Sequence, residues 1–252
     1  MKKIFISFIL FSLLILSACK GNRTTKKSEE KAGPVIVAST SWTAAFADIA
    51  GADKVEIIAP ANLRHPPEYE ITVDDIVKIQ NSQFFIFAGF ERMMKTLGDA
   101  VGETQMVKIR CDNSYQTVAS EAGKIAELLG TKDECEKRLA SYKETIEQGK
   151  KMLEEKSLAG VRVLCNANQI YLAKDLGLEI AGTFGPGPVT SDQIADAKTG
   201  GYVYIIDNVH NPVGGPLAEV APDSKYIIWR NFPESVKRAA LEEVISKNIE
   251  QL

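Results

Sequence analysis

The sequence predicts an α/β protein of two lobes, each with a roughly four-stranded, mainly parallel sheet flanked by helices, joined by one long backbone helix. Three observations predict this fold. Short apolar runs rich in β-branched residues alternate with helical periodicity along most of the 252-residue chain, as in parallel sheets with helical crossovers. The alternation occurs in two series of similar length. Between them, residues 132–158 keep helical periodicity without a break and would extend roughly 35–40 Å, longer than a crossover needs.

The N-terminal segment predicts export and a lipid anchor. Two lysines precede an apolar run that ends in LSAC at residues 16–19. This run has the length of a secretory signal and is too short for a permanent membrane span. LSAC has the form of a lipobox, whose cysteine receives the lipid. We therefore expect a signal peptide at 1–18, lipidation at Cys19 and a disordered polar stalk over 19–33, with an ordinary signal peptide as the alternative.

An N-terminal lobe is expected over residues 34–131. Its clearest helix start is at Thr72, because Asp75 three residues later completes a capping box. Short β-branched and aromatic runs mark the strands, and apolar residues at helical spacing mark the helices. Strands are expected at 34–40, 55–60, 83–89 and 106–110, and helices at 41–54, 72–82, 91–101 and 116–129.

A C-terminal lobe with the same alternation is expected over residues 159–252, after the linking helix at 132–158. The prolines of the GPGP turn at 185–188 remove the N–H donors that a phosphate cradle needs. No residue-by-residue repeat relates the two halves. Strands are expected at 161–166, 178–184, 202–207 and 225–230, and helices at 169–177, 190–200, 214–220 and from Glu234 onward.

Composition and motifs argue against several classes of protein. The formal net charge is −3, so no basic face for nucleic acid is indicated. G-x-S-x-G, H-E-x-x-H, phosphate-loop and C-x-x-C motifs are absent from the sequence. We therefore expect no enzyme and no catalytic cofactor, with acid–base chemistry by a histidine as the weaker alternative. Of Cys111, Cys135 and Cys165, at most two can pair within the chain.

A binding site is expected where the strands end. Ligands of open parallel sheets bind at the carboxyl ends of the strands. Both histidines of the chain, His65 and His210, follow expected strands, and so do three arginines, Arg64, Arg110 and Arg230.

The run HPPEYEITVDDIVKIQNSQFFIFAGFERMM, beginning at residue 65, resembles the zinc- and manganese-type solute-binding lipoproteins of ABC transporters. These carry a pattern like D-P-H-x-Y-E-P-x-P-x-D, followed by an apolar strand, a glycine and a glutamate. The resemblance continues through TSDQI and NFPESV. It implies two four-stranded lobes, a rigid linking helix and a ligand in the cleft between them. It also implies a monomeric, extracytoplasmic receptor whose partners are a permease and its ATPase.

The ligand positions of the family are altered in this sequence. Pro67 stands where the resemblance puts the first ligand histidine, and no histidine stands near Asp112, at the second position. Asn166 falls on the third position and Glu234 on the fourth. Only Glu234 keeps a side chain that zinc readily binds.

Three interpretations of the cleft follow. In the first, a zinc or manganese site is rebuilt from His65 and His210, with Glu234, Asp112 or Cys111 completing it. In the second, metal binding is lost, and arginines and amides bind a small non-metal ligand, organic or inorganic, of which an anion is the form that arginine favours. In the third, the fold serves as a surface adhesion module without a small ligand. The pocket of the second interpretation would use Arg64, Arg110, Arg230, Asn166, Asn168 and Trp42.

Overall fold

The computed structural model describes residues 36–98 and 100–252, which lie within one compact unit. The expected signal peptide, the lipidation site at Cys19 and the stalk lie outside the described residues.

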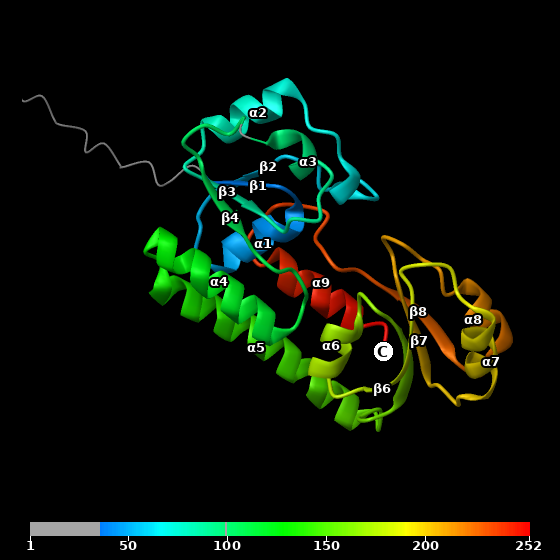
Figure 1. The fold of residues 1–252 in the computed structure, drawn as a ribbon. Coiled ribbons are helices and arrows are strands. Elements are labelled where there is room, and N and C mark those ends of the chain that lie inside the picture. Colours follow the sequence, from blue (N-terminus) through cyan, green and yellow to red (C-terminus); the bar gives the residue numbers. More distant parts are fainter. Residues whose placement is uncertain (1–35, 99) are drawn as a thin grey trace, which may run out of the picture. The chain divides into compact units, whose positions relative to one another are not determined.

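The first sheet has the strand order β2-β1-β3-β4, and all of its strands are parallel (Figure 1). A helix follows each of its strands, so every connection is a crossover. Its strands are β1 (Ile36–Ala38), β2 (Val55–Ile57), β3 (Phe84–Phe87) and β4 (Gln105–Lys108); the helices that follow them are α1 (Ser41–Ile49), α2 (Val73–Gln80), α3 (Met94–Leu97) and α4 (Tyr115–Leu129).

The second sheet repeats this architecture with the order β6-β5-β7-β8, again all parallel. The two sheets confirm the expected fold class. The strands are β5 (Arg162–Asn166), β6 (Glu179–Phe184), β7 (Tyr204–Asn208) and β8 (Lys225–Trp229); the helices are α6 (Ile170–Asp175), α7 (Ser191–Thr199), α8 (Gly215–Val220) and α9 (Ala240–Ile249).

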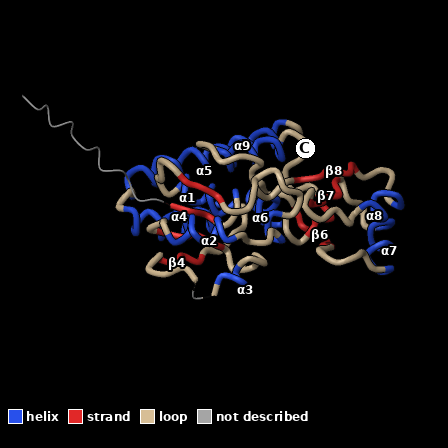
Figure 2. The backbone as a smooth tube through the Cα atoms, turned by 90° about the horizontal axis from the view of Figure 1, so that it is seen from above, coloured by secondary structure: helices blue, strands red, loops and turns tan. Residues whose placement is uncertain are grey.

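The helix α5 (Lys132–Glu155) joins the two series of elements and has 24 residues, which corresponds to roughly 36 Å. Figure 1 and Figure 2 show α5 running from the first sheet toward the second, with α9 beside it. Capping boxes begin three of the crossover helices and satisfy their first backbone N–H groups. The pairs are Thr40 with Thr43, Thr72 with Asp75, and Thr190 with Gln193.

Two helices differ from the sequence-based expectation. The C-terminal helix begins at Ala240, not at Glu234, because residues 231–239 are used to pass from β8 back to the first lobe. Ala239 ends that passage with a positive φ of 57°, a conformation that interrupts a helix. The helix expected at 91–101 is reduced to α3 (Met94–Leu97), which ends at Gly98 with a φ of 45°.

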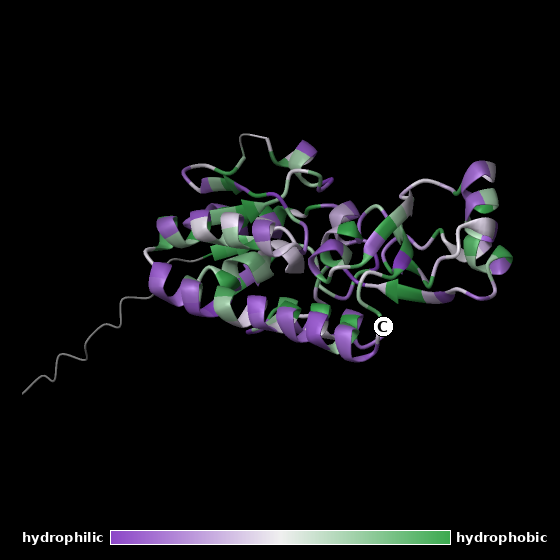
Figure 3. Cartoon of the chain, turned by 90° about the horizontal axis from the view of Figure 1, so that it is seen from below, coloured by the Kyte–Doolittle hydropathy of each residue, from purple (hydrophilic) through white to green (hydrophobic). Residues whose placement is uncertain are grey.

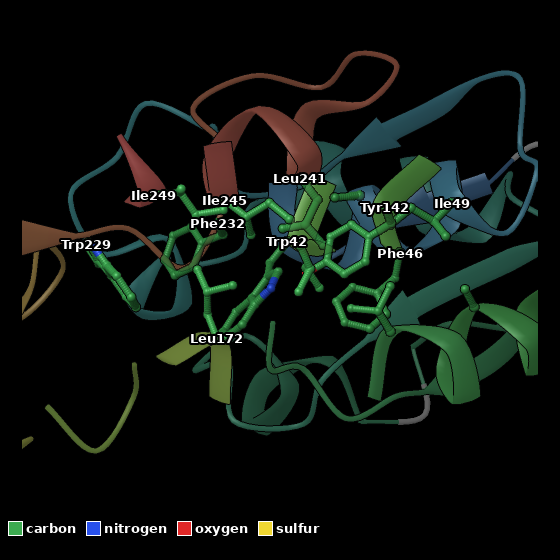
Figure 4. Packing of buried hydrophobic residues seen from close by; sticks show 14 of the residues in the cluster. Trp42, Phe46, Ile49, Tyr142, Leu172, Trp229, Phe232, Leu241, Ile245 and Ile249 are labelled. Carbon is green, nitrogen blue, oxygen red and sulfur yellow. The ribbon is translucent and has the colours of Figure 1, made fainter. Parts of the chain in front are cut away.

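One hydrophobic core is shared by both lobes. Strand residues alternate between two faces, and the inward face of each sheet, with Phe84 of β3 and Tyr204 of β7, belongs to the same buried cluster. Figure 3 shows apolar strands behind helices with polar outer faces. Figure 4 shows how side chains from α1, α5 and α9 interdigitate in this cluster. It runs through Trp42, Phe46, Tyr142, Leu172, Trp229, Phe232, Leu241 and Ile249.

The outward faces of the two sheets pack into separate clusters. Phe85 of β3 lies under α2 and α3 with Ile79 and Leu97, while Ile205 of β7 lies under α7 and α8 with Ala197 and Leu217. Each lobe thus has its own outer core, and the inner core unites them.

Arg138 of α5 anchors the connection of α5 to the first lobe. Its guanidinium donates to the Asp48 backbone oxygen at 2.6 Å, to Asp48 Oδ1 at 3.0 Å and to the Ala52 backbone oxygen at 3.1 Å. The Arg138 side chain is 7% exposed. Because a buried charge must be paired and hydrogen-bonded, this arrangement orients α5 against α1.

Cys111, Cys135 and Cys165 are all free thiols. Cys135 packs within the shared core. Within residues 36–98 and 100–252, no helix is both long enough and apolar enough to cross a membrane.

Candidate ligand-binding cleft

The loops at the carboxyl ends of the strands enclose a pocket of about 530 Å³, which we call the cleft pocket. The first lobe contributes the loops after β2, β3 and β4 and the start of α1, and the second lobe contributes the loops after β5, β6, β7 and β8. The location agrees with the rule for ligands of open parallel sheets. The cleft pocket is lined by Trp42, His65, Pro67, Glu68, Phe90, Cys111, Asp112, Asn168, Tyr171, Pro186, Asn208, His210, Asn211, Asn231 and Phe232.

Aromatic rings form much of the cleft pocket. The Trp42 ring lies 5.4 Å from Phe232 and 6.4 Å from Phe90, both in tilted arrangements, at separations typical of favourable aromatic pairs. Trp42 Nε1 donates to Asn113 Oδ1 at 2.9 Å. The indole is therefore held by a hydrogen bond at one end and by aromatic contacts across the lobes.

Asp207 at the end of β7 organises the loop that carries His210. Its Oδ2 accepts from the Gly214 backbone N–H at 2.6 Å and from the Tyr226 hydroxyl at 2.8 Å. Its Oδ1 accepts from Asn166 Nδ2 at 2.9 Å. Asp207 is fully buried, and this network closes the loop over residues 207–214. Burial, together with the hydrogen bond to Asp207, raises the pKa of Tyr226, so the hydroxyl stays protonated as a donor.

His210 lies between the two lobes. Its ring stacks on Phe232 with centroids 3.7 Å apart and planes 8° apart. His210 Nδ1 lies 3.1 Å from the Arg64 backbone oxygen, which is an acceptor only, so Nδ1 carries the proton and donates. Nε2 then presents a lone pair.

The Nε2 atom of His210 is buried and has no hydrogen-bond partner within the described residues. Burial lowers the pKa of His210 to about 4, and Arg230 and His65 lower it as well, against the hydrogen bond to Arg64. The imidazole is therefore neutral at pH 7, in the form that binds metals or accepts a hydrogen bond. Leaving such an atom unsatisfied costs about 1–3 kcal/mol, so a ligand that reached Nε2 would recover this free energy.

His65 and Asp112 also line the cleft pocket. His65 precedes the short 3-10 helix η1 (Pro66–Glu68) in the loop after β2. Asp112 is 4% exposed, and its carboxylate accepts from the Ser114 hydroxyl at 2.5 Å and from the Thr117 hydroxyl at 2.7 Å. Both Asp112 oxygens therefore already accept hydrogen bonds, and the carboxylate holds Ser114, the N-cap residue of α4.

Cys111 lines the same pocket as a partly buried thiol. Burial raises its pKa well above the ordinary value, and the carboxylates of Glu91, Glu121 and Asp112 add to the shift. The thiol is therefore protonated at neutral pH, and metal ligation needs the thiolate.

The remaining predicted site residues lie outside the cleft pocket. Arg64 and Glu234 line a second pocket of about 420 Å³, together with Arg230 and with His210, which borders both pockets. We call it the arginine pocket. Glu234 is paired with Arg230 at 2.9 Å. The arginine pocket is lined by Ala61, Asn62, Leu63, Arg64, Val209, His210, Pro212, Ile228, Arg230 and Glu234.

Asn166 is completely buried and lines neither pocket. Besides the Asp207 contact through Nδ2, its Oδ1 accepts from the Asn168 backbone N–H at 3.0 Å. Both polar ends of the side chain are thus occupied. Arg110 also lines neither pocket; it pairs with Asp112 at 3.4 Å and donates to Thr117.

The six residues expected to form a non-metal pocket are thus divided. Arg64 and Arg230 line the arginine pocket, Trp42 and Asn168 line the cleft pocket, and Arg110 and Asn166 line neither.

The glutamate that follows the strand and glycine in the family pattern is Glu91, and its role here is structural. Glu91 Oε1 accepts from Ser39 Oγ at 2.5 Å and from the Ala88 backbone N–H at 2.8 Å. Oε2 accepts from the Gly89 backbone N–H at 2.6 Å. Glu91 is 1% exposed, so it ties the turn after β3 to the end of β1.

Sequence reasoning missed several pocket residues. Asn208 and Asn211 follow the strand expected at 202–207, and this position at a strand end could have marked them as binding residues. Phe90 and Phe232 also follow expected strands and had the same signal. Tyr171 lies within α6 and gave no such signal, because exposed and buried aromatic residues have the same appearance in a sequence.

The donors of the cleft pocket do not form a complete metal site. Within the described part of the chain, no three histidine, cysteine, aspartate or glutamate side chains are grouped so that they could hold a metal ion. No lysine or arginine is present among the residues that line the pocket. The pocket therefore offers imidazole nitrogen, carboxylate oxygen, amides and aromatic faces.

The architecture defines the chain as a two-lobed α/β protein with the fold of solute-binding proteins. Among solved structures, the laminin-binding protein Lmb of Streptococcus agalactiae, described as having adhesin and metal-transporting activity, aligns with a TM-score of 0.67 and 15% identity over 86% of this chain and 97% of that chain. FpvC of Pseudomonas aeruginosa, solved with Ni²⁺, aligns with a TM-score of 0.70 and 15% identity over 86% and 95% of the chains.

A Mn-bound periplasmic metal-binding protein from Candidatus Liberibacter asiaticus aligns with a TM-score of 0.62 and 15% identity, over 86% of this chain and 97% of that chain. At this level of identity the alignments establish the fold that the sequence resemblance implied. No protein-family model matches the sequence, and no curated protein matches it.

Proposed function

We propose that this protein is the extracytoplasmic substrate-binding lipoprotein of an ABC importer, and that it carries a divalent transition metal such as zinc or manganese. The observation that carries the proposal is the buried, unpartnered Nε2 of His210 at a pocket between two lobes. The likeness in fold to proteins solved with Ni²⁺ and Mn²⁺ supports a metal as cargo. A receptor of this kind makes and breaks no bond, so we propose no enzymatic activity.

The proposed role requires a membrane permease and its ATPase as partners. The lipid at Cys19 would keep a monomeric receptor next to that permease. The net charge of −3 and the absence of lysine and arginine from the lining of the cleft pocket favour a cation over an anion as the bound species.

We assign the metal-binding role to His65, His210 and Asp112, because these predicted residues line the cleft pocket. Two imidazoles and a carboxylate are suitable ligands for zinc. Because these three side chains are not grouped as a metal site in the described structure, binding requires the cleft to rearrange. Asp112 would first have to release Ser114 or Thr117, and a wall side chain would have to move to expose His210 Nε2. We assign no direct contact with the metal to Arg64, Asn166 and Glu234.

A non-metal organic cargo is the second candidate. Aromatic rings and asparagine amides line the cleft pocket, and its volume lies in the range typical of small-molecule sites. The same lining argues against a small anion, because no lysine or arginine lies on it.

Thermal unfolding of metal-free protein with Zn²⁺, Mn²⁺ or Ni²⁺ tests the metal proposal. A bound metal stabilises the folded state by RT ln(1 + [L]/Kd), about 2.7 kcal/mol at one hundred times Kd. A chelator should reverse the shift. If no divalent metal shifts the transition, with or without added small molecules, the metal proposal fails.

Two substitutions of His210 sharpen this test. His210→Asn keeps a donor near the Arg64 oxygen and removes the Nε2 position, whereas His210→Gln places an amide group near that position. Loss of the metal response in both, with unfolding of the unliganded proteins little changed, is the expected result. His65→Ala should weaken the response in the same way.

A further inference from the structure

The cleft pocket has too few free donors for a bare metal ion. Zinc takes four ligands, and octahedral metals take six. Asp112 already accepts hydrogen bonds at both carboxylate oxygens, and no three potential ligands are grouped in the described residues. Among the described residues His210 Nε2 has no hydrogen-bond partner, but it is buried, so a wall side chain must move before it can bind. His65 is the other imidazole on the wall. Most of the coordination sphere must therefore come from elsewhere.

The cleft pocket is also much larger than an ion. Its volume is about 530 Å³, whereas one water molecule takes about 30 Å³. Its walls are the rings of Trp42, Phe90, Tyr171 and Phe232 and several amide side chains. Such walls pack against flat organic groups and exchange hydrogen bonds with them, and a bare ion would use neither property.

We infer that the cargo is a divalent transition metal already held by a small nitrogen-donor chelator, and that His210 Nε2 supplies a remaining ligand to that complex. This inference rests on the proposed function and names its substrate class. The chelator provides the donors that the protein lacks, and its organic part packs against the aromatic lining of the cleft pocket, which includes Trp42, Phe90 and Tyr171.

The charges at the pocket select among such complexes. Glu68 and Asp112 line it, and no lysine or arginine does. A neutral or cationic complex meets these carboxylates favourably, while a complex with excess carboxylate meets like charge. Nitrogen-donor chelators form neutral or cationic complexes with divalent metals, and polycarboxylates form anionic ones.

The experiment compares the affinity of the metal-free chain for Ni²⁺ alone and for equimolar Ni²⁺ with L-histidine, 2,2′-bipyridine or citrate, measured by isothermal titration calorimetry. Each chelator is also titrated alone. A tridentate or bidentate chelator at one equivalent leaves at least one position of the metal open for an imidazole. Elemental analysis and mass spectrometry of the desalted protein then count metal and chelator per chain.

The expected result is binding at least tenfold tighter for Ni²⁺ with L-histidine or with 2,2′-bipyridine than for Ni²⁺ alone, with one metal and one chelator retained. His210→Asn should lose at least tenfold of that affinity. Asn62→Ala, in the arginine pocket, is the matched control and should bind as the native chain does. Citrate should weaken binding.

The outcomes separate this inference from the proposed function. Ni²⁺ alone binding as tightly as both nitrogen complexes overturns the chelator inference and leaves the metal receptor standing. Chelator alone binding as tightly as its complex removes the metal from the proposed function. An unchanged affinity of the His210→Asn variant for the nitrogen complexes overturns the role of His210 as a ligand. Tightest binding of Ni²⁺ with citrate overturns the selection of complexes by the charges at the pocket. No binding of any metal species overturns both.

Discussion

The His210 ring lies flat on the Phe232 ring, with centroids 3.7 Å apart and planes 8° apart. The two residues reach this contact from different strand ends of the second lobe, after β7 and after β8. Phe232 thereby covers one face of an imidazole whose Nδ1 donates to the Arg64 backbone oxygen. This cover contributes to the burial that lowers the pKa of His210.

Phe232→Leu should raise the pKa of His210 from about 4 toward its ordinary value of 6.5, because burial is the main cause of the shift. The imidazole proton resonances, followed by NMR against pH, measure the change, and His210→Asn assigns the signals. Phe90→Leu is the control, since the exposed Phe90 contacts Trp42 and lies outside the stacked pair. An unchanged pKa in Phe232→Leu would contradict the role of the stacked ring.

Asp207→Asn should destabilise the second lobe by about 2–6 kcal/mol. The amide nitrogen faces groups that themselves donate, so two buried donors lose an acceptor at about 1–3 kcal/mol each. Urea unfolding measures the difference in free energy. Tyr226→Phe removes one O–H donor from Asp207 and should cost only about 0.5–1.5 kcal/mol. Equal costs for the two variants would argue against Asp207 as the organising residue of the loop.

Asn113→Asp should loosen the passage from β8 back to the first lobe. Asn113 Nδ2 donates to the Asn231 backbone oxygen at 2.8 Å, and the substitution puts an acceptor there while keeping an acceptor for Trp42 Nε1. Amide hydrogen exchange over residues 231–239 should accelerate, and stability should fall by about 1–3 kcal/mol.

Two serine substitutions serve as comparisons for Asn113→Asp. Ser41→Ala removes another contact to the same passage, Ser41 Oγ to the Pro233 oxygen at 2.6 Å, and should also accelerate exchange there. Ser224→Ala removes a bond within the second lobe, to the Tyr202 oxygen at 2.7 Å, and should leave exchange at 231–239 unchanged. Faster exchange in Ser224→Ala would show that general destabilisation is the cause.

Glu242→Leu should make the folded protein more stable at neutral pH. Glu242 is 6% exposed, and among the described residues neither carboxyl oxygen has a partner in hydrogen-bond geometry, although its own backbone N–H lies near. Burial raises its pKa above the ordinary 4.5, with Asp48 adding to the shift. The folded state thus binds the proton more tightly, and stability falls as pH rises from the ordinary pKa through the raised one.

Urea unfolding between pH 2 and pH 8 measures this dependence. The Glu242→Leu chain should gain most over the native chain at the upper end and least near pH 4, and Glu242→Gln should share the flatter profile. Glu243 is the control of opposite sign, because Lys237 and Lys247 lower its pKa to about 2. Glu243→Gln should lose stability that is present above pH 4.5 and disappears toward pH 2. A Glu242→Leu profile parallel to the native one would show that Glu242 ionises freely.

Much of the fold could be predicted because its signals are local. The aromatic and β-branched runs that became β3 and β7, the Thr72 capping box and the unbroken periodicity of α5 each need only neighbours in sequence. The C-terminal helix was predicted to begin too early because its true start is set by tertiary contacts, which local sequence does not show. Residues 234–239 have helical composition but are pulled out of a helix by the passage between lobes, where Asp48 Oδ2 accepts from the Ala239 backbone N–H at 3.0 Å.

The candidate site was less predictable, because a ligand position depends on long-range geometry. Asn166 occupies a strand end as expected, yet its amide is used by Asp207, 41 residues away. Arg64 and His65 are adjacent in sequence but line different pockets, since successive residues of an extended loop point in different directions. Glu234 follows its strand as expected and then pairs with Arg230.

The sequence by itself determined the two parallel sheets, the linking helix and the strand ends where a ligand would lie, since hydrophobic periodicity and capping act over a few residues. Only the tertiary structure decided that both lobes share one core through α1, α5 and α9, and that His65 and His210 line one pocket while Asn166 does not. The physical reason is that a ligand is bound only when the side-chain donors of the site stand at suitable distances from one another. Packing and buried hydrogen bonds between distant segments set those distances.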